Sequence, residues 1–232
     1  MDICRKCYIY KDNFFYTAMR LNQDYKNEAL AALKGNWAPA VVATIILYIM
    51  SMVAGGATGL MNPVSYILSS ALFGLFWLFT IFVINPLQTG YANSLKTLSQ
   101  DGDSDIINNM FRIGFGRYLH IVWGTFLTGL FTFLWALLLI VPGIIKSFSY
   151  AMTPFILIDN PELTANEAID RSRAMMRGHK FDLFWLLLSF IGWFILCMLT
   201  LGIGFFWLIP YTYTSVAGFY KDVKAEYESR QK

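Results

Sequence analysis

Charged residues divide the chain into long apolar stretches and shorter polar ones. Residues 35–95, 118–158 and 181–220 contain only two Asp, Glu, Lys or Arg side chains, Lys146 and Asp182. A membrane-spanning helix needs about 20 predominantly apolar residues, so each of these stretches is long enough to cross a bilayer twice. The pattern predicts an all-α integral membrane protein with about six transmembrane helices, arranged as three hairpins.

Glycine and proline residues mark a turn in the middle of each predicted hairpin. The turns are expected at residues 55–63, at Pro142 and Gly143, and at residues 202–204, because these residue types end helices and permit tight turns. The six predicted spans are residues 37–53, 66–86, 119–141, 144–158, 184–201 and 205–219.

The second limb of each hairpin carries a proline and several polar side chains. Pro86, Pro154 and Pro210 each remove a backbone donor, and interrupted spanning helices expose carbonyl groups that form binding sites in transporters. A proline near the end of a spanning helix is also ordinary packing geometry, and that alternative stays open. The residues of the candidate polar cavity or hinge are Asn85, Pro86, Lys146, Ser149, Tyr150, Thr153, Pro154, Pro210, Tyr211 and Thr214.

Lys146 has two interpretations. It is the one charged group expected within the bilayer, where an ionisable residue is a functional candidate. Only two residues separate it from Gly143, so its side chain could instead extend to the outer headgroups and anchor the turn. We expect the anchor, and the alternative is a ligand held beside Ser149 and Tyr150.

Polar segments with helical spacing precede the hairpins. Residues 1–34 form a preface with an amphipathic helix from residue 13, and residues 35–232 form the membrane domain with its cytoplasmic connectors and a basic tail. Because each hairpin follows such a helix, the sequence predicts an internal repeat. The alternative is that three unrelated apolar hairpins, each preceded by a polar segment, would show the same pattern without being a repeat.

The two connectors each predict a surface helix. In the first, an acidic cluster from Asp101 to Asp105 is expected to stabilise a helix N-terminus rather than to bind calcium, because the glycine and glutamate of a calcium loop are missing. In the second, Thr164 and Glu167 have the spacing of a capping box. The apolar face of that helix is predicted to hold Ala165, Ala168, Ile169, Met175 and Met176.

The composition agrees with a membrane protein, and the charge distribution predicts its orientation. The 232 residues are 56% hydrophobic and only 14% charged, with a net charge of +3. All Arg residues, and all Lys residues except Lys146, fall in the ends and connectors, so the positive-inside rule predicts that both termini are cytoplasmic. The first thirty residues lack the apolar core of a signal peptide, which agrees with that orientation.

The sequence contains no recognisable catalytic arrangement. His120 and His179 are expected at the membrane boundary as isolated side chains, and Cys4 and Cys7 form a single CxxC pair without a second pair of metal ligands. The chain has no GxSxG, HExxH or phosphate-binding loop. We therefore expect no catalytic, metal-binding or cofactor-binding residues, and no enzyme.

The C-terminal hundred or so residues resemble a known family. The likeness lies in residues 140–146, in residues 150–154 and 159–161, in residues 172–179 and 188–193, and in Gly202, Gly204, Pro210 and Tyr211. These segments resemble bacterial multi-pass membrane proteins catalogued as domain of unknown function 975. The resemblance implies a shared architecture in the bacterial cytoplasmic membrane, and it implies no activity.

Two functions remain after these exclusions. The first is a non-enzymatic scaffold or accessory component that contacts membrane lipids and a membrane-protein partner or a second copy of itself, because buried charged groups are scarce. The second is a transporter or channel for a small or lipid-like solute that uses proline-broken helices. Neither involves nucleic acid.

Overall fold

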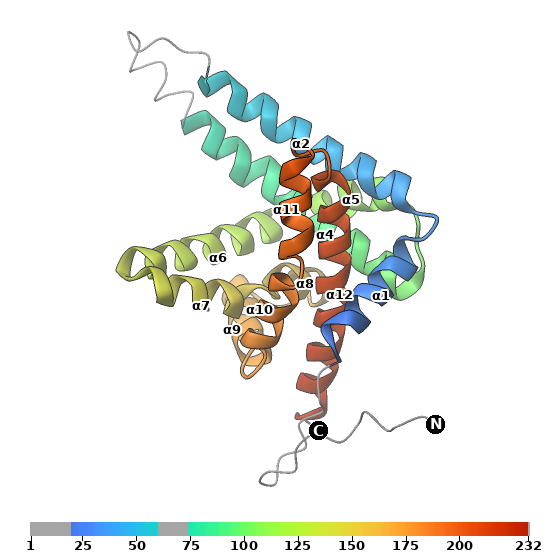
Figure 1. The fold of residues 1–232 in the computed structure, drawn as a ribbon. Coiled ribbons are helices and arrows are strands. Elements are labelled where there is room, and N and C mark those ends of the chain that lie inside the picture. Colours follow the sequence, from blue (N-terminus) through green and yellow to red (C-terminus); the bar gives the residue numbers. More distant parts are fainter. Residues whose placement is uncertain (1–19, 60–73, 232) are drawn as a thin grey trace, which may run out of the picture.

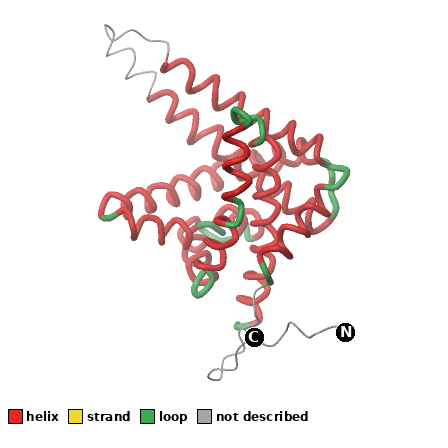
Figure 2. The backbone as a smooth tube through the Cα atoms, in the orientation of Figure 1, coloured by secondary structure: helices red, strands yellow, loops and turns green. Residues whose placement is uncertain are grey.

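The computed structural model describes residues 20–59 and 74–231, and both ranges are helical with short connections (Figure 2). Within them no residue forms a strand. The Cys4 and Cys7 pair, the start of the first amphipathic helix and the turn of the first predicted hairpin lie outside the described residues. The predicted all-α class is confirmed for the part of the chain that the structure describes.

Helices form in the apolar segments of the sequence and also in the polar connectors. They are α1 (Asn22–Leu33), α2 (Trp37–Gly59), the π-helix η1 (Thr80–Ile84), α4 (Asn85–Asp101), α5 (Ile106–Gly116), α6 (Tyr118–Leu138), α7 (Ile140–Tyr150), α8 (Thr153–Asp159), α9 (Ala165–Met175), α10 (Lys180–Leu188), α11 (Ile191–Leu199) and α12 (Phe205–Ser229).

Several helical segments are long and apolar enough to cross a membrane. Four such segments are present among the described residues: Gly74–Asp101, Tyr118–Leu138, Ile140–Asp159 and Lys180–Leu199. A fifth is added if α1 and α2, which meet at 98°, are counted together. The predicted count of six spans in three hairpins remains a prediction.

Pairs of neighbouring helices diverge from a common base, which we define as α4, α8, α9 and the lower part of α12 (Figure 1). α2 lies beside the helix that leads into α4, α6 lies beside α7, and α11 lies beside the first part of α12. The far ends of the pairs point in different directions, whereas α4, α8, α9 and the lower part of α12 pack together. Within the apolar 18-residue stretch of each segment, the buried share is 39% for Gly74–Asp101 and 44% for Ile140–Asp159. It is lower, at 17% and 22%, for Tyr118–Leu138 and Lys180–Leu199.

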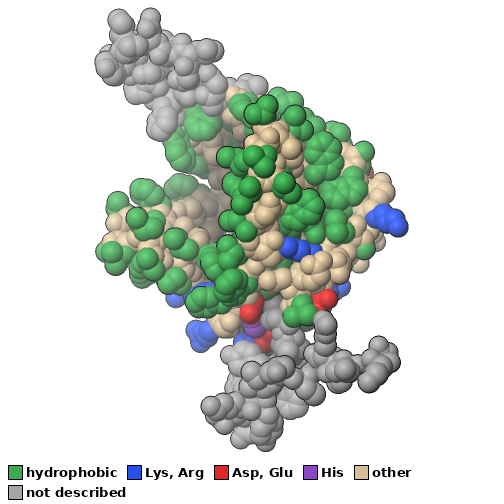
Figure 3. All heavy atoms as spheres, in the orientation of Figure 1, with side chains coloured by type: hydrophobic (Ala, Val, Ile, Leu, Met, Phe, Trp, Pro, Cys, Tyr) green, Lys and Arg blue, Asp and Glu red, His purple; other side chains and the backbone are tan. Residues whose placement is uncertain are grey.

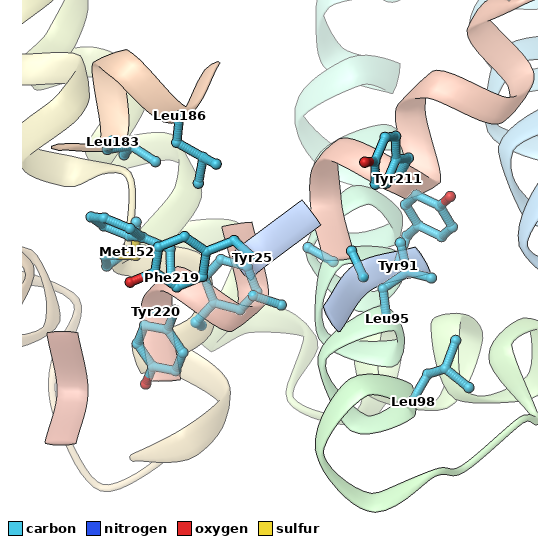
Figure 4. Close-up of a cluster of buried hydrophobic side chains, with 14 of the residues drawn as sticks. Tyr25, Tyr91, Leu95, Leu98, Met152, Leu183, Leu186, Tyr211, Phe219 and Tyr220 are labelled. Carbon is cyan, nitrogen blue, oxygen red and sulfur yellow. The ribbon is translucent and has the colours of Figure 1, made fainter. Parts of the chain in front are cut away.

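Buried aromatic and aliphatic side chains hold the base together. Tyr25 of α1, Tyr91 of α4, and Phe219 and Tyr220 of α12 are among the largest fully buried side chains (Figure 4). Tyr25 meets Phe219 edge to face at 5.7 Å, and Phe155 stacks on Tyr220 at 5.0 Å between ring centroids. Burying such rings is the largest stabilising contribution that single side chains can make to the base.

The turn between α6 and α7 lies three residues before the predicted position. Leu139 is the extended residue between the helices, and Pro142 and Gly143 belong to the first turn of α7. A proline is tolerated there because the first turn leaves its backbone donors unpaired. Gly143 instead permits close packing, since a β-carbon on it would lie 2.7 Å from the α-carbon of Ala136.

Only one of the three predicted proline interruptions is a break in the helix. α7 ends at Tyr150 and α8 begins at Thr153, just before Pro154. α12 continues through Pro210, and α4 continues through Pro86 after the wider π-helical turn of η1. The prediction of proline-broken helices therefore holds at Pro154 and is wrong at Pro86 and Pro210.

The predicted surface helices are present and pack on the base. The Thr164 backbone N–H donates to Glu167 Oε2 at 2.7 Å, which confirms the capping box of α9. The predicted apolar face of α9 is buried. α5 crosses α4 at Gly90, where a β-carbon would lie 2.1 Å from the carbonyl oxygen of Met110, so this crossing requires glycine.

The acidic cluster stabilises the start of α5, as predicted. The Asp105 backbone N–H and the Asn109 side-chain amide both donate to Asp103, at 3.1 and 2.6 Å. The hydrogen bond from the Asp105 backbone, with that from Asn109, lowers the pKa of the Asp103 carboxyl. The Asp105 carboxylate accepts from the Asn108 side-chain amide at 3.1 Å, so both carboxylates contact the start of α5.

Candidate binding pocket

An ionic cluster ties the inner helices together at the base. Asp159, at the end of α8, accepts hydrogen bonds from Lys96 of α4, from Lys224 of α12 at 2.7 Å and from the Tyr220 hydroxyl at 2.9 Å. Lys96 is only 5% exposed. A buried ammonium group is tolerated because it is paired, so this cluster fixes the relative positions of α4, α8 and α12.

A pocket with a volume of about 630 Å³ lies between the same helices, a short distance along their axes. On each helix a pocket residue precedes a residue of the cluster by six or seven positions, which corresponds to about 9–10 Å of helical rise. The matched residues are Thr89 and Lys96, Thr153 and Asp159, and Tyr213 and Tyr220.

The wall of the pocket is mainly apolar, and its polar side chains are all uncharged. α6 and residue Leu187 of α10 complete the wall, and Gln88 and Gly129 are exposed, so the pocket is open on one side. The molecular surface is hollowed between the α6–α7 pair and the neighbouring helices (Figure 3). The lining residues are Asn85, Gln88, Thr89, Ala92, Thr125, Thr128, Gly129, Ala151, Thr153, Pro154, Phe155, Leu187, Thr212, Tyr213 and Val216.

The polar groups of the wall differ in their hydrogen bonding. Thr125, Thr128 and Thr212 donate to carbonyl groups of their own helices at 2.8–2.9 Å. Thr153 is 1% exposed, and its hydroxyl oxygen has no hydrogen-bond partner among the described residues. A buried hydroxyl without a partner is costly, so Thr153 is the pocket residue whose polar group the protein itself leaves unsatisfied.

The backbone carbonyl groups at the helix interruptions already have partners. Ser172 of α9 donates to the Ser149 carbonyl at 2.9 Å, where α7 gives way to α8. Lys26 of α1 donates to the Ser189 carbonyl between α10 and α11 at 2.8 Å. Tyr118 donates to a carbonyl group within η1. Side chains of the protein therefore occupy these three carbonyl groups.

The predicted site residues separate into two groups. Asn85, Thr153 and Pro154 line the pocket. The others do not line it: Pro86, Ser149, Tyr150, Pro210, Tyr211 and Thr214 are buried elsewhere, and the Lys146 ammonium lies 4.5 Å from the centre of the Trp135 ring. Among the second-limb residues Ser149, Tyr150, Thr153, Tyr211 and Thr214, Thr153 alone lines this pocket.

Several pocket residues were missed by the sequence prediction. They are Gln88, Thr89, Thr125, Thr128, Thr212 and Tyr213. A signal for part of this set was present, because Thr125, Thr128 and Thr132 recur at helical spacing in an otherwise apolar span. The sequence interpretation treated this first limb as plain and looked for polar groups only on the second.

The two histidines lie in different surroundings. His179 is 3% exposed and lies 3.2 Å from Glu226 and 3.1 Å from Asp182. His120 lines a separate apolar pocket of about 680 Å³ between α6 and the helix before α4. No group of three His, Cys, Asp or Glu side chains suited to a metal ion occurs in the described ranges.

These features define a protein that is helical over its described residues, with several helices long and apolar enough to cross a membrane. Residues 136–227 match the model of a family described as "Protein of unknown function (DUF975)". The match confirms the family resemblance of the C-terminal region. No curated protein and no solved structure matches the chain.

Proposed function

We propose that this chain is a membrane protein that binds and moves a small or lipid-like neutral molecule through the pocket between α4, α6, α8 and α12. The observation that carries the proposal is the buried, unpartnered hydroxyl of Thr153 beside a mainly apolar pocket whose wall also holds threonine and amide side chains. Pockets of 300–1,000 Å³ with a few polar groups are typical of small-molecule sites, and this one measures about 630 Å³.

The character of the wall favours a neutral amphiphile. No Asp, Glu, Lys, Arg or His lines the pocket, so a charged ligand would be buried without a compensating partner. Threonine, asparagine and glutamine side chains can hydrogen-bond a hydroxyl or amide head, and the exposed helices around the pocket are strongly apolar. A molecule with an uncharged polar head and a hydrocarbon tail suits both surfaces.

The orientation belongs to the proposal. α1 contacts the lower part of α12, where Tyr25 donates to Asp222 at 2.9 Å, so the two ends of the described chain share the base. We propose that the base faces the cytoplasm because most Lys and Arg residues are expected there. The pocket then lies about 10 Å from the ionic cluster, in the inner half of the bilayer.

A hydroxyl-to-methyl exchange tests this function. The purified protein in nanodiscs is exposed to a photoactivatable monoacylglycerol, and Thr153→Val is compared with wild type. Removal of one hydrogen bond should lower the binding affinity by about threefold to tenfold. The stability should not fall, because the Thr153 hydroxyl has no partner within the protein.

Thr132→Val is the matched control. Thr132 lies on α6 outside the pocket, and its hydroxyl donates to the carbonyl of Thr128 at 2.8 Å. The control should bind the probe as wild type does. Equal affinities for the wild type and both variants would contradict the proposed function.

A scaffold or accessory role is the second candidate. It is favoured by the hydrogen bonds that Ser172 and Lys26 donate to the carbonyl groups of Ser149 and Ser189. These bonds hold the helices in one conformation, which suits a scaffold. In that role the pocket would be filled passively by lipid, and a membrane-protein partner or a second copy would bind the exposed apolar helices. Specific co-purification of such a partner, together with unchanged probe binding in Thr153→Val, would favour this candidate.

A further inference from the structure

Four basic side chains from three segments gather beside the α6–α7 pair. Lys180, at the start of α10, interacts electrostatically with Lys146 of α7 and with Arg173 and Arg177 at the end of α9. The contact of Phe148 with Phe184, 6.0 Å between ring centroids, joins α7 to α10 at this point. Among the described residues, only Arg173 of the four has a carboxylate within 4.0 Å.

The surface next to this basic cluster is apolar. Ile144 and Ile145 of α7 are exposed, and so are Phe181 and Trp185 of α10. Basic side chains lie beneath the apolar surface of the α6–α7 pair (Figure 3). A soluble anion would need only the charges, whereas a molecule with an anionic head and hydrocarbon tails would cover both surfaces.

The position of Lys146 also limits how deep the hairpin reaches. Lys146 is seven positions after the turn residue Leu139, which corresponds to about 10 Å of helical rise. The hydrocarbon core of a bilayer is about 30 Å thick. If the cluster lies at one headgroup layer, the tip of the hairpin ends within the same half of the bilayer. Its five tip residues, 137–141, are 64–75% exposed and all apolar.

We propose that Lys146, Arg173, Arg177 and Lys180 bind the headgroup phosphates of anionic phospholipids, and that the α6–α7 hairpin lies in the leaflet that holds those headgroups. The expectation that Lys146 anchors at the outer surface conflicts with this arrangement. The other three basic residues belong to the connector expected on the cytoplasmic side, and the contact of Phe148 with Phe184 holds α7 beside α10, so Lys146 lies at the same headgroup layer as they do. This inference does not depend on the ligand of the Thr153 pocket.

Native mass spectrometry of the full-length protein tests the lipid site. The protein is released from nanodiscs containing equal amounts of phosphatidylglycerol and phosphatidylcholine, and the retained lipids are counted. Arg177→Gln with Lys180→Gln should weaken retention of phosphatidylglycerol about fivefold per charge removed, and less at high salt. Retention of phosphatidylcholine should not change.

Lys34→Gln with Lys221→Gln is the matched control. These two lysines are exposed and lie on other segments, so this variant loses the same charge without touching the cluster. It should retain phosphatidylglycerol as wild type does. Equal losses in both double variants would indicate a general attraction to anionic lipid and overturn the site, as would no loss in either.

A depth measurement provides a second test that does not depend on lipid counting. A spin label at Leu139→Cys, in a variant lacking the native cysteines, is examined in vesicles with oxygen and a water-soluble nickel chelate as relaxing agents. We expect the label within about 10 Å of the depth of the headgroups that contact Lys146. A label at the opposite headgroup layer would overturn the proposed position of the hairpin.

Discussion

The ionic cluster and the pocket lie on the same three helices but differ in how their polar groups are satisfied. At the cluster, the Asp159 carboxylate accepts from three donors and the buried Lys96 is paired. About 10 Å away, the Thr153 hydroxyl has no partner. The unpartnered Thr153 hydroxyl therefore lies on the same helices as the ionic cluster around Asp159. The difference indicates that the base fixes the helices at a separation that leaves the pocket open.

The largest expected effect is at Asp159. Asp159→Ala leaves the buried Lys96 ammonium unpaired and removes the hydrogen bonds of α8 with Tyr220 and Lys224 of α12. Breaking a buried ion pair by removing one partner costs about 3–5 kcal/mol. The free energy of unfolding, measured by SDS titration in mixed micelles, should fall by that amount, and the pocket should then lose its ability to bind the monoacylglycerol probe.

Asp170→Ala is the control for this change. Asp170 pairs with Arg173, but both side chains are at least half exposed, so the loss should be below about 1 kcal/mol. If Asp159→Ala were no more destabilising than Asp170→Ala, the cluster would not be what fixes the helices.

A smaller effect is expected at the interruption between α7 and α8. Ser172→Ala leaves the buried Ser149 carbonyl without its side-chain donor, which should cost about 1–3 kcal/mol. The same SDS titration measures it, with Ser147→Ala as control because the Ser147 hydroxyl is exposed and bonds within its own helix. A stable Ser172→Ala variant would mean that water or lipid replaces the serine.

The smallest effect concerns the first turn of α9, and it depends on pH. Thr164→Ala should cost about 1 kcal/mol of local stability. The Thr164 backbone N–H lowers the pKa of Glu167 from its ordinary value of 4.5, so the contribution of this carboxylate is complete above about pH 4.5 and is lost as pH falls through the lowered pKa. Glu167→Gln should lack this acid dependence.

Hydrogen exchange of the α9 backbone amides, corrected for intrinsic rates, measures both effects. The exchange of α5 amides serves as an internal reference for the Thr164→Ala comparison at constant pH, because the side-chain hydrogen bonds of Thr164 are with Glu167 of α9. An identical acid response in wild type and Glu167→Gln would show that the capping box does not control the start of α9.

Local features of the fold could be predicted from the sequence. Thr164 and Glu167 identified the start of α9 because a capping box acts within one helical turn. The buried face of α9 followed from its spacing. The turn at Leu139 was misplaced because Gly143 has a packing role against Ala136, which depends on the neighbouring helix and has no separate sequence signal.

The candidate site was less predictable because its partners are distant in sequence. Asp159 is 63 positions from Lys96 and 65 from Lys224, so charge counting alone could not pair them. Asn85, Thr153 and Pro154 were found because they interrupt apolar spans. The threonines of α6 were missed because each bonds within its own helix and so causes no visible break.

The contacts of α1 also set an order of events during synthesis. Tyr25 bonds to Asp222, 197 positions later, and Lys26 bonds to the carbonyl of Ser189, 163 positions later. Ribosomes add roughly 5–20 residues per second, so Tyr25 waits on the order of 10–40 s before its partner exists. α1 is made before every other described helix, yet it can complete its contacts only after nearly the whole chain has left the ribosome.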